Sequence, residues 1–138
     1  MLTDFYVGRL SDAEEIVSGA SSLRPRLSIR NADNAVLADL WAAIDPGADV
    51  APLQGDACIV ASRSEGPWVL ALPAGLVDGL AAVTEGAIPA ICERWCAGEE
   101  MAFHNVPEDV MRRPLVDLIE VASEAKNADH ALLLWMSV

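Results

Sequence analysis

Two periodicities of apolar residues alternate along the chain and predict its secondary structure. Alternation with period two, typical of half-buried strands, occurs at Thr3–Gly8 and Arg26–Arg30. The runs Ala57–Ser62 and Trp68–Leu72 are also strand-like, and the turn-rich residues between them predict a hairpin. The final run, Ala131–Val138, is apolar at nearly every position, which is typical of a central strand covered on both faces.

Apolar residues three and four positions apart predict helices between these strands. A capping box at Ser11–Glu14 predicts the start of a short helix, and Asp33 or Asn34 is expected to cap a second. Further helices are expected after Pro73, after Thr84 and from Pro114, since proline favours the first turn of a helix. The expected buried stripes are Val36, Leu37, Leu40, Trp41 and Ile44; Leu76, Val77, Leu80 and Ala81; Ile88, Ile91, Cys92, Trp95 and Cys96; and Leu115, Leu118, Ile119, Ala122 and Ala125.

The elements predict a single α+β domain spanning residues 1–138. We expect a mixed, largely antiparallel sheet of about four or five strands with helices packed on it. The loop Asp45–Pro52 contains two prolines and a glycine, but the residues before it are too few for an independent core. Met101–Asn105 is expected to form a loop, followed by a turn or a single helical turn at Val106–Asp109.

The excess of acidic residues limits which classes of macromolecule this protein is expected to bind. The chain has 21 acidic residues against 9 lysines and arginines, a net charge of −12. Such a surface repels DNA, RNA and anionic lipid, so we expect no nucleic-acid partner and no membrane partner. A basic protein partner fits this charge. A homodimer formed through an exposed apolar patch is compatible with it.

The cysteines and the N-terminus favour a cytoplasmic protein. The first residues, Met1–Tyr6, lack the basic and apolar segments of a secretory leader, and no apolar run is long enough to span a membrane. The three cysteines, Cys58, Cys92 and Cys96, are odd in number and lie in apolar stretches, as reduced thiols do.

One group of residues has the composition of a metal or thiol site. Cys92 and Cys96 share a helix face, and His104 follows eight residues later, with Glu100 between them. Both cysteines also lie on a stripe of core residues, where cysteine behaves as a small apolar side chain. The acidic neighbours would raise a thiol pKa, which opposes nucleophilic catalysis. The favoured interpretation is therefore core packing.

A catalytic role for His104 also competes with a simpler interpretation of the same residues. A carboxylate–histidine dyad with Glu100 is conceivable, and Cys96 is the candidate nucleophile, but a solvated loop explains the same residues. The sequence contains no nucleophile elbow, phosphate-binding glycine loop or zinc-protease motif. We therefore expect no cofactor and favour a protein that is not an enzyme.

The second half of the chain carries a series of carboxylates that predicts a docking surface for a basic partner. A solvated face is the alternative interpretation of the same residues. The candidate binding residues are Glu93, Glu99, Glu100, Glu108, Asp109, Asp117, Glu120 and Glu124.

Three segments together resemble a group of small bacterial α+β proteins. These segments are Trp95–Glu100, which closes a helix, the helix Leu115–Ala125, and the apolar tail Leu132–Val138. In the resembling proteins a helix ends in a Trp-Ala-x-x-Glu-Glu-like motif and the chain finishes with a Leu-x-Leu-Trp strand. The present chain departs from this motif by placing Cys96 after the tryptophan. The resemblance implies a fold and no particular activity.

The leading hypothesis is a non-enzymatic, acidic protein-binding module. Its size and charge are similar to those of immunity proteins that neutralise bacterial toxins, which is an analogy of size and charge alone. The alternative hypothesis is a small enzyme or metal-binding domain that uses Cys92, Cys96, Glu100 and His104.

Overall fold

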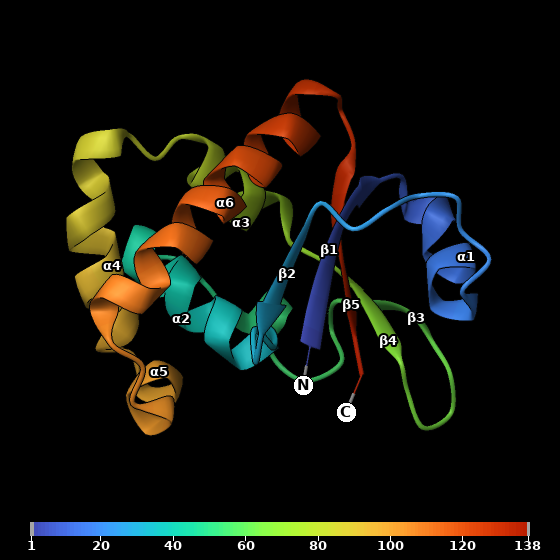
Figure 1. The fold of residues 1–138 in the computed structure, drawn as a ribbon, viewed down its shortest axis with the longest axis horizontal. Helices are drawn as coiled ribbons and strands as arrows, with labels where there is room; N and C mark the ends of the chain where they lie inside the picture. Colours follow the sequence, from blue (N-terminus) through green and yellow to red (C-terminus); the bar gives the residue numbers. More distant parts are fainter. Residues whose placement is uncertain (1, 138) are drawn as a thin grey trace.

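A five-stranded antiparallel sheet organises the computed structural model, which describes residues 2–137 (Figure 1). The strand order is β2-β1-β5-β4-β3, and every neighbouring pair is antiparallel. The α+β class is confirmed, and the predicted hairpin is the β3–β4 pair. The strands are β1 (Leu2–Gly8), β2 (Leu27–Arg30), β3 (Ile59–Ser62), β4 (Trp68–Ala71) and β5 (Ala131–Met136).

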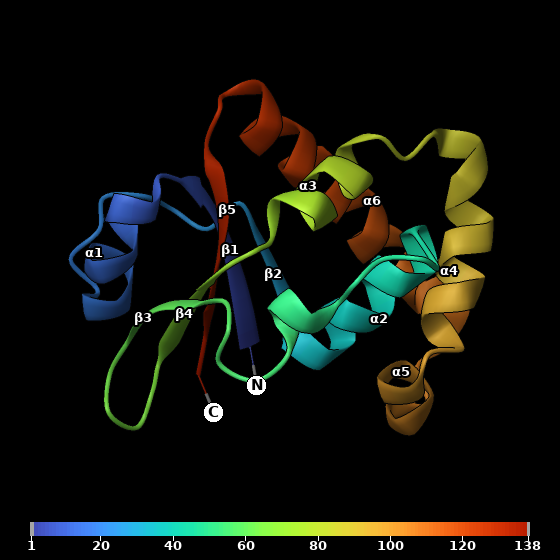
Figure 2. The same ribbon diagram turned by 180° about the vertical axis from the view of Figure 1, so that it is seen from behind.

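The helices cover the two faces of the sheet unequally, as the front and back views show (Figure 2). The short helix α1 packs on β3, β4 and β5 from one side, and the other helices lie together on the opposite side. Short 3-10 turns occupy Leu10–Asp12, Ala51–Leu53 and Glu85–Ala87. The α-helices are α1 (Ala13–Ser18), α2 (Asn34–Ile44), α3 (Ala74–Ala81), α4 (Ile88–Cys96), α5 (Glu99–His104) and α6 (Glu108–Asn127).

The apolar C-terminal strand is the centre of the sheet, as predicted. Leu132 and Leu134 of β5 belong to the large core beneath the helices, while Leu133 belongs to the smaller core beneath α1. All three side chains are fully buried. Each buried leucine contributes about 1.5–3 kcal/mol to the hydrophobic stabilisation, so the continuous apolar run is explained by burial on both faces. Val138, the last residue of the predicted strand, lies outside the described residues.

The first helix is capped differently from the prediction. The capping box expected at Ser11–Glu14 is wrong, because Asp12 supplies the capping oxygen instead. Asp12 Oδ2 accepts a hydrogen bond of 2.7 Å from the backbone N–H of Arg9. The 3-10 turn Leu10–Asp12 thus precedes α1 in the chain and leads directly into it.

The long helix α6 begins six residues earlier than predicted. Pro114 lies in its interior and not at its first position. The extended residue Pro107 fixes the start, and Glu108 and Asp109 then place negative charge in the first turn, where the helix dipole favours it. Pro114 removes the hydrogen bond to the carbonyl of Val110. The residue that loses this bond, Val110, is itself 56% exposed.

The segment Met101–Asn105, expected to be a loop, belongs mostly to the helix α5. The carboxylate of Asp39 on α2 accepts hydrogen bonds from the backbone N–H groups of Glu100, at 2.8 Å, and Met101, at 3.4 Å. A Cβ atom at Gly98 would lie 2.6 Å from Asp39 Oδ2, so glycine permits this approach. Asn105 ends the helix with a positive φ of 52°.

Between residues 2 and 137, no single helix combines the length and apolarity needed to cross a membrane. Within the same described residues, α3 taken together with residues 85–96 is the one pair that reaches that length and composition, across a bend of 104°.

Candidate functional site

The thiols of α4 face the protein interior. Cys92 is fully buried in the main core, and Cys96 packs against the same core while half-buried. Trp95 between them is fully buried, and its indole Nε1 donates a hydrogen bond of 3.1 Å to the carbonyl of Val36 on α2. The buried stripe predicted for this helix is therefore present, and it fixes α4 against α2.

The environment of these thiols keeps them protonated. Burial raises the pKa of the Cys92 thiol, and the neighbouring Cys96 and the Glu108 carboxylate raise it further, against an opposing effect of Arg112. Burial and then Glu108 also raise the pKa of the Cys96 thiol. A nucleophilic or metal-binding cysteine needs the opposite shift, because the thiolate is the reactive form.

The structure places His104 at the surface and the two cysteines against the core. His104 is exposed on α5. Its ring and the ring of Phe103 pack in a T-shaped arrangement, with their centroids 5.6 Å apart. Glu100 lies one helical turn away from His104, and its backbone N–H is bound to Asp39. Among residues 2–137, no three histidine, cysteine or acidic side chains are placed to hold a metal ion.

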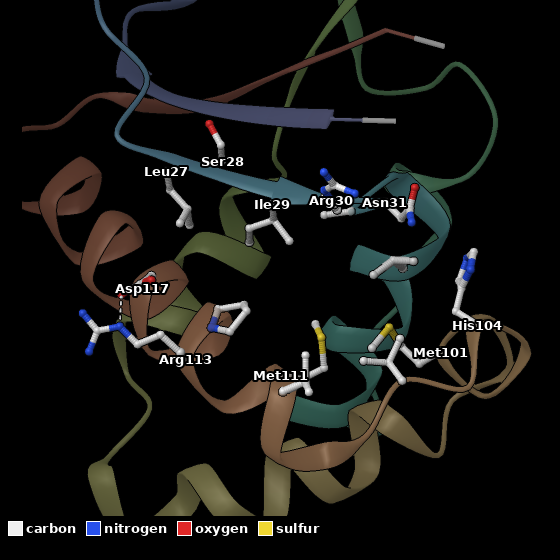
Figure 3. A pocket seen from close by; sticks show the side chains of 15 residues that line it. Leu27, Ser28, Ile29, Arg30, Asn31, Met101, His104, Met111, Arg113 and Asp117 are labelled. Carbon is white, nitrogen blue, oxygen red and sulfur yellow. Dashed lines mark ion pairs between the residues drawn. The ribbon is translucent and has the colours of Figure 1, made fainter.

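A groove of about 380 Å³ lies between the edge strand β2 and the first half of α6, closed at one end by α5 (Figure 3). Leu27 and Ile29 point into it from β2, opposite Met111 of α6 and Met101 of α5. This volume lies within the range of sites that bind small molecules or apolar side chains. The lining is mostly apolar, and Met101 and Met111 are themselves buried.

Polar side chains lie at the two ends of the groove. Arg113 Nε and Asp117 Oδ1 form an ion pair of 3.1 Å at one end, and Asn31 and His104 lie at the other (Figure 3). Arg113 is 79% exposed, so this pair contributes little to stability. The groove therefore has an apolar middle and hydrogen-bonding ends.

A second feature adjoins the groove where α5 meets α6. Phe103 is 83% exposed and Val110 is 56% exposed, which is unusual for large apolar side chains. Val110 also lines the groove. The carboxylates of Glu99, Glu108 and Asp109 are exposed on the same two helices. We call these exposed residues of the two consecutive helices the α5–α6 corner, defined by Phe103, Val110, Glu99, Glu108 and Asp109.

The predicted acidic residues divide into two groups in the structure. Five of the eight lie on α4, α5 and the first turn of α6, at one end of the molecule (Figure 1). Asp117, Glu120 and Glu124 continue along α6 away from that end. Two of these three have basic partners, because Asp117 pairs with Arg113 and Glu124 pairs with Arg26 at 2.7 Å.

Comparison with protein-family models, curated proteins and solved structures found no match to this chain. The resemblance to small bacterial α+β proteins therefore stays a prediction. Its motif residues have packing contacts here: Trp95 in the core, and the Leu132–Trp135 run in the central strand.

The sequence pattern did not indicate the groove, because its walls come from three separate segments. Two local signals were present. Leu27 and Ile29 form an apolar face on a very short strand, and Gly98, Glu99, Glu100 and Asn105 are typical of helix ends and first turns. The second signal predicts α5 when its four residues are considered together.

Proposed function

We propose that this protein is a non-enzymatic binding module that docks a basic protein partner on the α5–α6 corner. The exposure of Phe103 carries the proposal. Aromatic side chains surrounded by less critical contacts are frequent hot spots of protein interfaces. Among residues 2–137, Phe103 is the most exposed of the large apolar side chains, at 83%. A partner that covers this ring therefore removes more apolar surface from water than one that covers any of the others.

Charge supports a basic partner over a neutral or acidic one. Glu99 lies one helical turn before Phe103 on α5, and Glu108 and Asp109 are exposed in the first turn of α6, the helix that also carries Val110. The whole chain has a net charge of −12, which accelerates encounter with a cationic partner and repels an anionic one. The expected partner therefore offers an apolar pocket or patch ringed by lysine or arginine.

A selection from random peptides displayed on phage tests the proposal with the wild-type protein immobilised. We expect the enriched peptides to combine lysine or arginine with large apolar residues. After synthesis, their affinity for the free protein is measured by isothermal titration. Affinity should fall at least about tenfold in the variants Phe103→Ser and Val110→Ser, as loss of a hot-spot contact predicts.

The matched control is Leu10→Ser, because Leu10 is 59% exposed but lies in the turn before α1, on the other side of the molecule. This variant should bind the selected peptides as the wild type does. Affinity should also weaken as NaCl rises, since salt screens the contribution of the carboxylates. Enrichment of acidic or neutral peptides, or equal loss of affinity in the Leu10 variant, would contradict the proposal.

A further inference from the structure

The charged side chains that line the groove have the opposite balance to the chain as a whole. Two arginines, Arg30 and Arg113, line it, and Asp117 is the one carboxylate among the described lining residues. Asp117 is paired with Arg113, whereas Arg30 has no ion pair within residues 2–137. The whole chain has 21 acidic residues and a net charge of −12. The groove is therefore a place where this acidic protein presents an unpaired cation.

The unpaired arginine lies at one end of the groove together with two other polar side chains. Arg30 is the last residue of β2, Asn31 follows it, and His104 is the last residue of α5. Figure 3 shows these three at the same end, away from the pair of Arg113 and Asp117. A guanidinium, an amide and an imidazole can each donate a hydrogen bond, the imidazole in either protonation state. This end therefore offers several donors to a negatively charged group.

The middle of the groove is apolar and long enough for a short hydrocarbon chain. Ile29 on the β2 side and Met101 and Met111 on the opposite side line it, and all three residues are largely buried. Methionine side chains adapt to the shape of the group that they contact. A strand advances about 3.3 Å per residue, so the groove extends for about 10 Å along β2 from Leu27 to Arg30. Its volume of about 380 Å³ suits one small molecule.

We propose that the groove binds a small monocarboxylate with an unbranched apolar chain of medium length, such as octanoate. The carboxylate lies at the end formed by Arg30, Asn31 and His104, and the chain extends past Ile29 toward Pro114. A guanidinium can bind a carboxylate through two parallel hydrogen bonds. One unpaired arginine balances one negative charge, which favours a monocarboxylate over a doubly charged phosphate ester.

This binding site is separate from the docking function proposed above. Phe103, whose exposure carries that function, is not among the described residues that line the groove. Val110 belongs to both surfaces, so the variants that test the groove leave it unchanged. Failure of carboxylate binding would therefore leave the docking of a basic partner intact, and loss of docking would leave the groove intact.

The test compares three ligands that share one chain and differ in the head group: octanoate, octanol and octylammonium. Each is titrated calorimetrically into the wild-type protein at about 0.15 M NaCl, which screens the charge of distant residues. We expect octanoate to bind at least about tenfold more tightly than octanol, because octanol lacks the charge-assisted hydrogen bonds. Octylammonium should bind most weakly, although the net charge of −12 would attract it.

The length of the chain is tested with hexanoate and heptanoate beside octanoate. Each added methylene should tighten binding about fourfold as it enters the apolar middle of the groove. Equal affinities along this series would show that the carboxylate binds without its chain, and would overturn the proposed site.

Two variants that remove the same charge locate the carboxylate. Arg30→Gln should weaken binding of octanoate at least about tenfold and leave binding of octanol unchanged. The matched control is Arg24→Gln, because Arg24 is also exposed but lies before β2 and does not line the groove within the described residues. This control should bind octanoate as the wild type does.

Nuclear magnetic resonance of the methionine methyl groups locates the chain. The methyl signals of Met101 and Met111 should shift on addition of octanoate. The signal of Met136 on β5 should stay in place, because this residue does not line the groove within the described residues.

Three results would overturn the inference. The first is binding of octylammonium as tight as that of octanoate, and the second is equal loss of affinity in Arg30→Gln and Arg24→Gln. The third is a shift of Met136 as large as those of Met101 and Met111. The comparison of head groups and the methionine signals use the wild-type protein, so they decide the question even if Arg30→Gln does not fold.

Discussion

Thr3 shows how a single buried hydroxyl affects this fold. Its side chain is fully buried in β1, and within residues 2–137 its Oγ1 atom has no hydrogen-bond partner. A buried polar atom without a partner destabilises the folded state, whereas an apolar group of the same shape does not. We predict that Thr3→Val raises the free energy of unfolding by about 1 kcal/mol. Urea denaturation measures the change, and Thr84→Val at an exposed threonine should give no comparable gain.

The buried thiols predict a dependence of stability on alkaline pH. Burial raises the pKa of Cys58, Cys92 and Cys96 above the ordinary value of 9.0. The folded state therefore holds these protons more tightly than the unfolded state. Their contribution to stability is complete below about pH 9 and is lost as the pH rises through the raised values. The protein should therefore be less stable at strongly alkaline pH than at neutral pH.

Two measurements check this prediction. Denaturation at several pH values should show the free energy of unfolding falling above about pH 9, with a smaller fall in Cys92→Ala. Ellman's reagent should label all three cysteines in denaturant but react slowly with the folded protein. Rapid labelling of Cys92 in the native state would contradict its placement in the core.

At the scale of elements, the carboxylate of Asp39 stabilises the start of the helix α5. Asp39 caps α5 from α2, 61 residues away in sequence from Glu100. Substitution of a capping carboxylate by alanine costs about 0.5–2 kcal/mol. We predict that Asp39→Ala loses stability in this range and accelerates amide exchange in α5. Asp39→Asn, which keeps a capping oxygen, should retain most of the stability. Equal exchange rates in α5 for the wild type and Asp39→Ala would show that other contacts hold this helix.

The strands and the larger helices were predictable because their signals are local and repeated. Leu27 and Ile29 alternate within one strand, and Val36, Leu40 and Ile44 recur on one helix face. The predictions that were wrong concern helix starts, where a single polar contact or capping residue outweighs a local sequence pattern. Asp12 caps the first turn in place of Ser11, and Pro114 sits inside a helix because Pro107 and the first-turn acids define its start.

At the scale of the whole molecule, excess negative charge opposes folding. Among residues 2–137 there are three ion pairs, and all involve a side chain that is at least half exposed. Most of the 21 carboxylates therefore repel one another. We predict that the melting temperature rises when NaCl increases from about 0.01 M to about 0.15 M, where the Debye length falls from about 30 Å to about 8 Å. A melting temperature that is unchanged or falls would indicate that the net repulsion is negligible.

The sequence alone determined the strands, most of the helices and the central position of the last strand, because burial on one or both faces leaves a periodic record of apolar residues. It also determined the strong negative charge. Only the tertiary structure decided where the groove and the α5–α6 corner lie. Ile29, Met101 and Met111 come from three elements and share no local pattern, and Asp39 reaches the start of α5 only after α2 and α5 have packed. Contacts between distant segments leave no periodic signal in a single sequence, so the candidate sites exist as sites only in the folded chain.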